Sequence, residues 1–306
     1  MRSYRQTVIG PNLVQRARIM NIIRQFFVEN RYLEVETPLR IPAPAPEQHI
    51  DAEPSGRWFL HTSPELCMKR LLAAGFPRIY QITKCFRRKE RGSRHLPEMT
   101  LLEWYTANTD YSDMMDQCQD LILFLADRLR IDQPLAYQNH TIDINPPWPR
   151  LTVEAAFDRY GSISMVTALK DGRFDEVMGL EIEPRLGLTR PVFLCDYPAA
   201  CGALARLKPG RPDVAERFEL YIGSLELCNG FSELTDSKEQ RRRFEEESTR
   251  RRCSGKAAYP MPEAFLETLA DMPPASGNAL GIDRLVMLLA DQSHIDGVVA
   301  FIPEEL

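Results

Sequence analysis

The chain has 306 residues and a mass of 35.1 kDa, and its 44% hydrophobic and 26% charged residues are typical of an ordinary globular domain. No apolar run approaches the roughly 18 residues of a membrane helix, and the N-terminus has no apolar segment typical of a secretory signal. The formal net charge of −5 excludes a global positive field that would attract nucleic acid. Seven scattered cysteines without a C-x-x-C spacing argue against a disulfide scaffold or a structural zinc site, and they predict a cytoplasmic protein.

The first half of the chain predicts alternating helices and strands. The pair Gly10-Pro11 is typical of a helix start, and apolar residues at helical spacing continue to Phe27. A short strand over 33–36 is followed by a Pro-rich loop. After this loop, the pattern predicts a helix over 64–73, strands over 78–88 and 99–108, and a helix from an Asp110 cap to about Leu129.

The second half begins with a polar stretch, 131–190, whose weak helical signals and many Pro and Gly residues predict a small insertion. Beyond it, we expect strands near 191–196 and 216–227, a helix from an Asp236/Glu239 capping box to about Arg252, a strand over 277–281, a helix over 283–290 and a strand over 298–302. Hairpin strands with helices between them predict one α+β domain, 1–306, around an antiparallel sheet.

A basic segment, residues 84–98, separates the two strands of the first half. It holds six Lys and Arg against two Glu, in a protein that is acidic overall. Arg87 is anchored on the first of these strands, beside this charged segment, so its planar guanidinium is well placed to bind two oxygens of a polyphosphate. A solvated loop is the alternative interpretation.

Two carboxylates frame the motif from Glu226 to Glu233. Their spacing of seven positions is odd, so an unbroken strand would place them on opposite faces. The dipeptide Asn229-Gly230 predicts a hairpin turn, which would pair 226 with 233 and bring their Cβ atoms to roughly 5 Å. A bulge at Gly230 would also bring them together. Mg²⁺ would relieve the repulsion between them, whereas a plain exposed hairpin is the alternative.

A third motif places an arginine behind two glycines. Gly277 and Gly281 allow the backbone to approach a ligand closely, and Arg284 lies in the first turn of the predicted helix. Alone, this spacing most often serves packing. Together with the two preceding motifs, it predicts a site that binds a nucleotide.

In their order along the chain, these motifs resemble those of class II aminoacyl-tRNA synthetases of the lysyl subgroup. Residues Glu34–Pro38 resemble motif 1, Phe86–Glu103 resemble motif 2 and Ala279–Leu285 resemble motif 3. The segments Thr62–Glu65 and Glu226–Glu233 resemble two further signatures of the lysine subgroup. The resemblance covers about residues 10–303 and implies a homodimer that uses ATP and Mg²⁺.

Within this family, the chain is most similar to the ligases that modify elongation factor P. It begins within a dozen residues of the first catalytic helix, which implies that it has no anticodon-binding domain. The expected reaction activates lysine or (R)-β-lysine as an adenylate and transfers it to a lysine of elongation factor P.

The resemblance also assigns roles to individual residues. It implies that Arg87 and Arg284 are catalytic, and that Glu226 and Glu233 hold Mg²⁺. Contacts to ATP are implied for Arg87, Lys89, His95, Leu96, Met99, Glu226, Leu227, Gly281 and Arg284. Contacts to the amino acid are implied for Ser63, Pro64, Glu65, Tyr105, Asn229, Glu233 and Ala279. We add Glu103 to the second set, because it faces the same side of its strand as Tyr105.

Motif 2 departs from the family pattern at three ATP positions. Lys89 stands where the family has a carboxylate that accepts a hydrogen bond from the adenine amine, and lysine cannot accept one. Leu96 and Met99 replace an asparagine and an aromatic ring. Two other functions therefore stay open: a weakly active paralogue that senses lysine or nucleotide, and an enzyme that transfers its amino acid to a small molecule.

Overall fold

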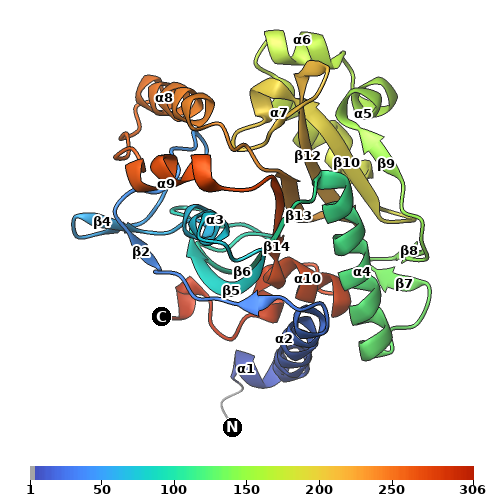
Figure 1. Ribbon diagram of the computed structural model, residues 1–306. Helices are drawn as coiled ribbons and strands as arrows, with labels where there is room; N and C mark the ends of the chain where they lie inside the picture. Colours follow the sequence, from blue (N-terminus) through green and yellow to red (C-terminus); the bar gives the residue numbers. More distant parts are fainter. Residues whose placement is uncertain (1–3) are drawn as a thin grey trace.

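The computed structural model describes residues 4–306. Within them, nine strands form one sheet in the order β1-β5-β6-β14-β13-β12-β10-β9, with β11 paired to β12 (Figure 1). Only β1 with β5 and β9 with β10 are parallel in it; the other pairs are antiparallel. Its strands are β1 (Leu33–Glu34), β5 (Arg78–Phe86), β6 (Glu98–Ala107), β9 (Arg150–Thr152), β10 (Val192–Pro198), β11 (Leu207–Lys208), β12 (Arg211–Ile222), β13 (Leu225–Ser232) and β14 (Ala275–Gly281). The predicted α+β class is confirmed.

The helices of the first half follow the prediction closely. They are α1 (Arg5–Val8), α2 (Gly10–Glu29), α3 (Glu65–Ala73) and α4 (Tyr111–Leu129). Asp110 caps α4, because its carboxylate accepts hydrogen bonds from the backbone N–H groups of Ser112 and Asp113. Between α2 and α3, the Pro-rich loop adds a small sheet of β2 (Arg40–Ile41), β3 (Pro54–Ser55) and β4 (Trp58–Leu60).

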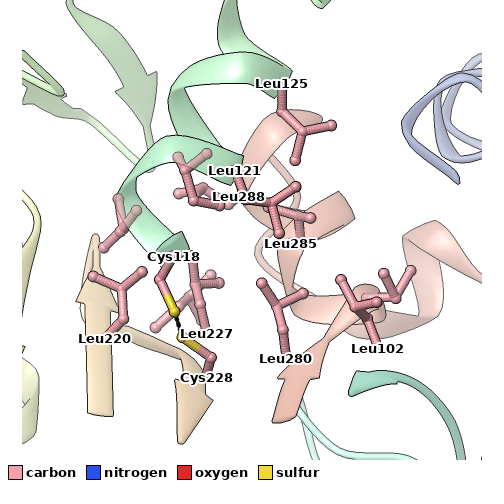
Figure 2. Close-up of a cluster of buried hydrophobic side chains, with 14 of the residues drawn as sticks. Leu102, Cys118, Leu121, Leu125, Leu220, Leu227, Cys228, Leu280, Leu285 and Leu288 are labelled. Atoms are coloured by element: carbon pink, nitrogen blue, oxygen red, sulfur yellow. Dashed lines mark hydrogen bonds between the residues drawn. The ribbon is translucent and has the colours of Figure 1, made fainter. Parts of the chain in front are cut away.

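The main hydrophobic core lies between one face of the sheet and the helices α2, α4 and α10 (Ile282–Leu289). Figure 2 shows its centre, where Leu121 and Leu125 of α4 meet Leu285 and Leu288 of α10 above Leu280 of β14. Residues of β6 alternate across the sheet: Leu102 and Trp104 belong to this core, while Glu103 and Tyr105 face the opposite side. That opposite side carries the polar motifs.

The polar stretch after α4 folds into a hairpin and a group of short helices. These are β7 (Leu135–Tyr137), β8 (His140–Ile142), α5 (Val153–Tyr160), α6 (Met165–Lys170), α7 (Phe174–Val177), η1 (Met178–Ile182) and η2 (Glu183–Arg185). The helices pack against β10 and β12 around a hydrophobic cluster of their own, which includes Phe157, Phe174 and Ile182. The predicted insertion thus adds a separate small core beside the main one (Figure 1).

Two helices follow β13 on the site side of the sheet, α8 (Ser237–Cys253) and α9 (Glu263–Thr268). Asp236 caps α8 through the N–H groups of Lys238 and Glu239. The predicted capping box is only half formed, because the side chain of Glu239 binds Arg242 and Arg243 instead. The short helices η3 (Ala199–Cys201) and η4 (Leu269–Asp271) complete this side.

The single strand predicted over 216–227 is wrong. The chain reverses at Gly223-Ser224, whose φ angles of 61° and 59° form the turn between β12 and β13. Asn229-Gly230, the predicted turn, lies inside β13. Its glycine serves close packing, because a Cβ at Gly230 would lie 2.7 Å from atoms of Asn278 and Phe218.

The strand predicted over 298–302 is also wrong, since this segment lies between the 3-10 helices η5 (Ile295–Val298) and η6 (Pro303–Glu305). Arg5 binds the carbonyl oxygens of Asp296, Val299 and Ala300, so these acceptors need no strand partner. Across residues 4–306, no helix combines the length and apolar character that crossing a membrane requires.

Candidate active site

A cavity of about 340 Å³ lies on the polar face of β6, β14 and β13, opposite the main core. It brings together residues from all of the predicted motifs, although they lie up to 221 positions apart in the chain. The predicted residues that line it are Ser63, Glu65, Arg87, His95, Leu96, Met99, Glu103, Tyr105, Glu226, Leu227, Asn229, Ala279, Gly281 and Arg284. Pro64, Lys89 and Glu233 were also predicted at the site but do not line the cavity.

One end of the cavity is built around Arg284 at the start of α10. Its guanidinium donates to the backbone oxygen of Glu226 (2.8 Å), to the carboxylate of Glu226 (3.0 Å) and to Nε2 of His95 (2.6 Å). Burial and the nearby Arg284 lower the pKa of His95, so the imidazole is neutral and accepts this hydrogen bond. Arg87 and Arg94 line the same region, and Nε of Arg87 is buried without a hydrogen-bond partner. This end of the cavity suits an anion.

The loop of motif 2 explains how the chain manages without a carboxylate at position 89. Lys89 has a left-handed φ of 66°, is exposed and does not line the cavity. The next residue, Glu90, lines the cavity, and its Oε2 is buried without a hydrogen-bond partner, 3.7 Å from Nη1 of Arg87. The sequence interpretation missed Glu90 because it compared positions one by one. An acceptor is thus present one residue later than expected.

The predicted pairing of Glu226 with Glu233 across a turn is wrong, because β13 runs straight through 229–230. A bulge does occur, but at Leu227 instead of Gly230, since Leu220 pairs with Cys228 while Tyr221 pairs with Glu226. The extra residue shifts the alternation, so Glu226 and Asn229 both line the cavity. The two glutamates have different partners: Glu226 binds Arg284, and Glu233 binds Lys69.

Glu219 of β12, which the sequence interpretation missed, is the carboxylate coupled to Glu226. Its Oε1 accepts hydrogen bonds from Arg217 (2.6 Å) and Asn229 (3.2 Å), and its Oε2 accepts one from Tyr221 (2.7 Å). Burial and the like charge of Glu226 raise the pKa of Glu219. Burial acts in the same direction on Glu226, but Arg284 outweighs it and lowers the pKa of Glu226. The available signal in the sequence was the position of Glu219 and Glu226 on either side of the possible turn at Gly223-Ser224.

This pair meets the chemical requirement for Mg²⁺, which prefers a few hard oxygen ligands and retains places for water and phosphate. No group of three or more His, Cys, Asp or Glu residues with metal-site geometry occurs within residues 4–306. A complete protein cage is therefore not formed by the described chain, and two carboxylates beside an anion-binding end fit a metal carried by a nucleotide. Glu233, the other predicted Mg²⁺ ligand, lies apart from this pair and contacts Lys69.

The opposite end of the cavity carries further carboxylates. Glu103 accepts hydrogen bonds from Ser63 Oγ (2.6 Å) and Tyr105 OH (2.9 Å). The contact with Tyr105 is expected, because both residues lie on the same face of β6. Burial and the like charge of Glu65 raise the pKa of Glu103 to about 7. Glu65 lines the cavity from the first turn of α3, and its backbone N–H donates a hydrogen bond to the Oγ of Ser63.

Glu233 lies behind this end, directly after β13, and its side chain has no exposed surface. Its Oε2 is 2.5 Å from Nζ of Lys69, a contact without hydrogen-bond geometry. Burial raises the pKa of Glu233 to about 8, although Lys69 acts against this rise. Gly277 gives the carboxylate its space, since a Cβ there would lie 2.4 Å from Glu233 Oε1. This end therefore suits a ligand with ammonium groups.

The sheet and the divided cavity are those of a class II synthetase core, and the comparison of sequences agrees. The chain belongs to the family "tRNA synthetases class II (D, K and N)", whose model matches residues 1–305. The predicted resemblance to this family is confirmed.

The most informative relatives are ligases of two kinds. The chain is 39% identical to the elongation factor P–(R)-beta-lysine ligase of Vibrio atlanticus, over 94% of each chain. It is 38% identical to the ligase of the same name from Proteus mirabilis, over 95% of this chain and 94% of the relative. It is also 36% identical to the lysine–tRNA ligase of Moorella thermoacetica, over 97% of this chain but 67% of the relative. The predicted similarity to ligases that modify elongation factor P is therefore confirmed.

Proposed function

We propose that this protein activates a lysine-type amino acid with ATP and transfers it to a lysine side chain of elongation factor P. The observation that carries the proposal is the division of one cavity into a carboxylate end and an arginine end. The names of the relatives supply the acceptor, since several are ligases of (R)-β-lysine and elongation factor P.

In this proposal, the carboxylate end holds the amino acid. A lysine-type amino acid has two ammonium groups, which Glu65, Glu103 and Glu233 would bind through charge-assisted hydrogen bonds. Tyr105 and Ser63 fix the carboxylate of Glu103 by donating to both of its oxygens. The amino-acid carboxylate is then free to point toward the arginine end.

The arginine end would hold ATP. Arg87 has an unpartnered N–H in the cavity, which supports its role in binding the phosphate that is attacked and in stabilising the charge that develops there. Arg284 would bind phosphate oxygens, and Leu96 and Met99 offer apolar surface to the purine. Glu90, in place of Lys89, is the candidate acceptor for the adenine amine.

Mg²⁺ would be held by Glu219 and Glu226, and it would supply positive charge to the phosphates. We propose this pair in place of Glu226 and Glu233, because the charge of Glu226 acts on Glu219 and raises its pKa, while Glu233 is bound to Lys69. Arg217 and Asn229 hold Glu219 from the cavity side.

The reaction has two steps. In the first, a carboxylate oxygen of the amino acid attacks the α-phosphorus of ATP, pyrophosphate leaves and an aminoacyl-adenylate forms. In the second, the ε-amine of the acceptor lysine attacks the adenylate carbonyl, AMP leaves, and the amine loses a proton as the amide forms. The sensor interpretation rested on the altered motif 2, and Glu90 offers an acceptor that weakens the part of that argument based on Lys89.

The assembly is proposed to be a homodimer that acts in the cytoplasm. The apolar side chains of Ile22, Phe26 and Phe27 on α2, near motif 1, are at most 8% exposed and belong to the core, so they offer little surface to an interface. Leu33 and Leu39 around motif 1 are instead 49% and 42% exposed, and they offer apolar surface to a second copy. Sedimentation at micromolar concentration tests this, and monomer alone would contradict it.

The test of the function separates the two steps. ATP–pyrophosphate exchange is measured with L-lysine, with (R)-β-lysine and without amino acid, and both lysine-dependent exchange and preference for one isomer are expected. Transfer of labelled amino acid is then measured to purified elongation factor P and to a variant whose acceptor lysine is arginine. Exchange with no transfer to the native factor would point to a small-molecule acceptor, and no exchange would contradict the proposal.

A further inference from the structure

Lys69 occupies a position that the proposed function does not explain. It lies on α3, one turn after Glu65, and its Nζ is 2.6 Å from Glu65 Oε1 and 2.5 Å from Glu233 Oε2. The side chain is 1% exposed, and its ammonium lies 5.0 Å from the ring centroid of Phe231. Lys69 does not line the cavity. Lys69 therefore contacts two carboxylates of the amino-acid end, Glu65 in the cavity lining and Glu233 behind it, without lining the cavity itself.

The charges around this end do not balance without a ligand. Glu65 and Glu233 share one ammonium, that of Lys69, while Glu103 and Glu47 add two further carboxyl groups to the cavity lining near Glu65. Burial alone would lower the pKa of Lys69, but Glu233 and Glu65 outweigh this effect and raise it, so the lysine is charged. Burial raises the pKa of Glu103 to about 7 and that of Glu233 to about 8, so these carboxyl groups become fully charged near neutral pH when a ligand supplies positive charge, as the ammonium groups of a lysine-type amino acid would.

The neighbouring elements supply no second cation to the two carboxylates that Lys69 binds. Tyr105 of β6 donates to Glu103, and the residues of α9 packed against α3 include the apolar Phe265 and Leu266. Arg243 of α8 is bound to Glu239 and to backbone oxygens of residues 203 and 205. The charge of Arg87 lowers the pKa of Glu103, but this is the smallest of the effects on that carboxyl group. Removal of Lys69 would thus leave the carboxylates to neutralise themselves by binding protons.

We propose that Lys69 is a positioning residue that binds one oxygen of Glu65 and one of Glu233, and so leaves their other oxygens as charged contacts for a substrate with two ammonium groups. Glu233 Oε1 supports this assignment, because it is buried, has no hydrogen-bond partner and borders Gly277 of the cavity wall. The inference rests on the proposed function, since it explains how the pocket selects a diamino acid.

The expected consequence is a change in the pH dependence of amino-acid binding. An ammonium group binds the ionised carboxylate, so a carboxylate that carries a proton must release it first, and affinity rises as pH rises through its pKa. In Lys69→Met, the pKa of Glu233 should rise further, because the ammonium that acts against this rise is lost. Each unit of pH below such a pKa costs about tenfold in affinity.

The experiment measures the dissociation constants of L-lysine and (R)-β-lysine by calorimetry between pH 6.5 and 8.5. For Lys69→Met, we expect affinity at pH 7 to fall by at least about tenfold and to recover toward the wild-type value at pH 8.5. The affinity for ATP should be unchanged at both pH values. Lys208→Met is the control for loss of a lysine ion pair elsewhere, because Lys208, which is 35% exposed, pairs with Asp196 (2.7 Å) away from the cavity.

Each outcome has a distinct meaning. Weaker binding that does not recover with pH, or that also affects ATP, would assign Lys69 a merely structural role and overturn the inference. If Lys69→Met does not fold, Glu65→Gln is compared with Glu65→Gln/Lys69→Met, in which one carboxylate fewer is left unpaired. The double variant should need a higher pH for binding than Glu65→Gln, and equal profiles would overturn the inference. If wild type binds neither isomer, it is the proposed function that fails.

Discussion

Gly277 gives the sharpest test of the amino-acid end, because the space at this position is so small. A Cβ at Gly277 would lie 2.3 Å from Cε1 of Tyr105 and 2.4 Å from Oε1 of Glu233. Since carbon atoms do not pack closer than about 3.5 Å, one methyl group must displace the tyrosine ring by about 1 Å. Tyr105 is 3% exposed and Glu233 is 2% exposed, so neither can move into solvent.

We therefore expect Gly277→Ala to damage amino-acid binding selectively. A misplacement of about 1 Å at a positioning group can cost about 10²-fold in activity, and overpacking typically costs about 1–3 kcal/mol of stability. ATP–pyrophosphate exchange should show a KM for lysine that is raised by about this factor, with the KM for ATP changed much less.

The control for this substitution is Gly179→Ala in the insertion, where an added Cβ meets no atom within 4 Å. Thermal unfolding of all three proteins shows whether each is folded at the assay temperature. An unchanged KM for lysine in a folded Gly277→Ala protein would refute the assignment of Tyr105 and Glu233 to the amino-acid pocket.

Three further substitutions test the rest of the cavity. Glu90→Gln should raise the KM for ATP several-fold, as expected for the loss of a hydrogen bond worth about 0.5–1.5 kcal/mol. Lys89→Ala, at an exposed residue outside the cavity lining, should not raise it, and the reverse result would assign the adenine contact to position 89. Glu219→Gln should raise the Mg²⁺ concentration needed for half-maximal exchange, and normal Mg²⁺ dependence would leave this carboxylate structural. Ala279→Gly, which removes a methyl group from the cavity wall, should change the ratio of kcat/KM for L-lysine and (R)-β-lysine in favour of L-lysine by about 10–200-fold; a ratio that moves by less than about twofold would place isomer choice elsewhere.

The sequence predicted the middle of the sheet well because its strands are bounded by strong local signals. Residues 78–88 and 99–108 are separated by a charged segment that cannot be buried, so the strand ends were visible. The turn between β12 and β13 was not predicted, because Gly223-Ser224 and Asn229-Gly230 are both acceptable hairpin turns. Only the packing of Gly230 against Asn278 and Phe218, from two neighbouring strands, decides between them.

The position of Lys89 shows a second limit of sequence comparison. Motif positions imply side-chain directions only while the backbone conformation is shared. Lys89 has a left-handed φ and does not line the cavity, whereas the next residue, Glu90, lines it. No spacing rule reports this, because a positive φ at a lysine is uncommon and depends on the loop around it.

The charge of the amino-acid end was missed for a different reason, although Glu65 and Lys69 are four residues apart on a predicted helix. This spacing is typical of exposed helix pairs, which contribute only about 0.2–0.5 kcal/mol. Burial changes its meaning: Lys69 faces inward, Glu233 arrives from the end of β13, and the lysine binds both carboxylates out of contact with water. In the role we propose for it, Lys69 does not touch the substrate but influences how many charges the cavity presents to it. Such a residue can be found only when the elements that carry its partners have been placed in space.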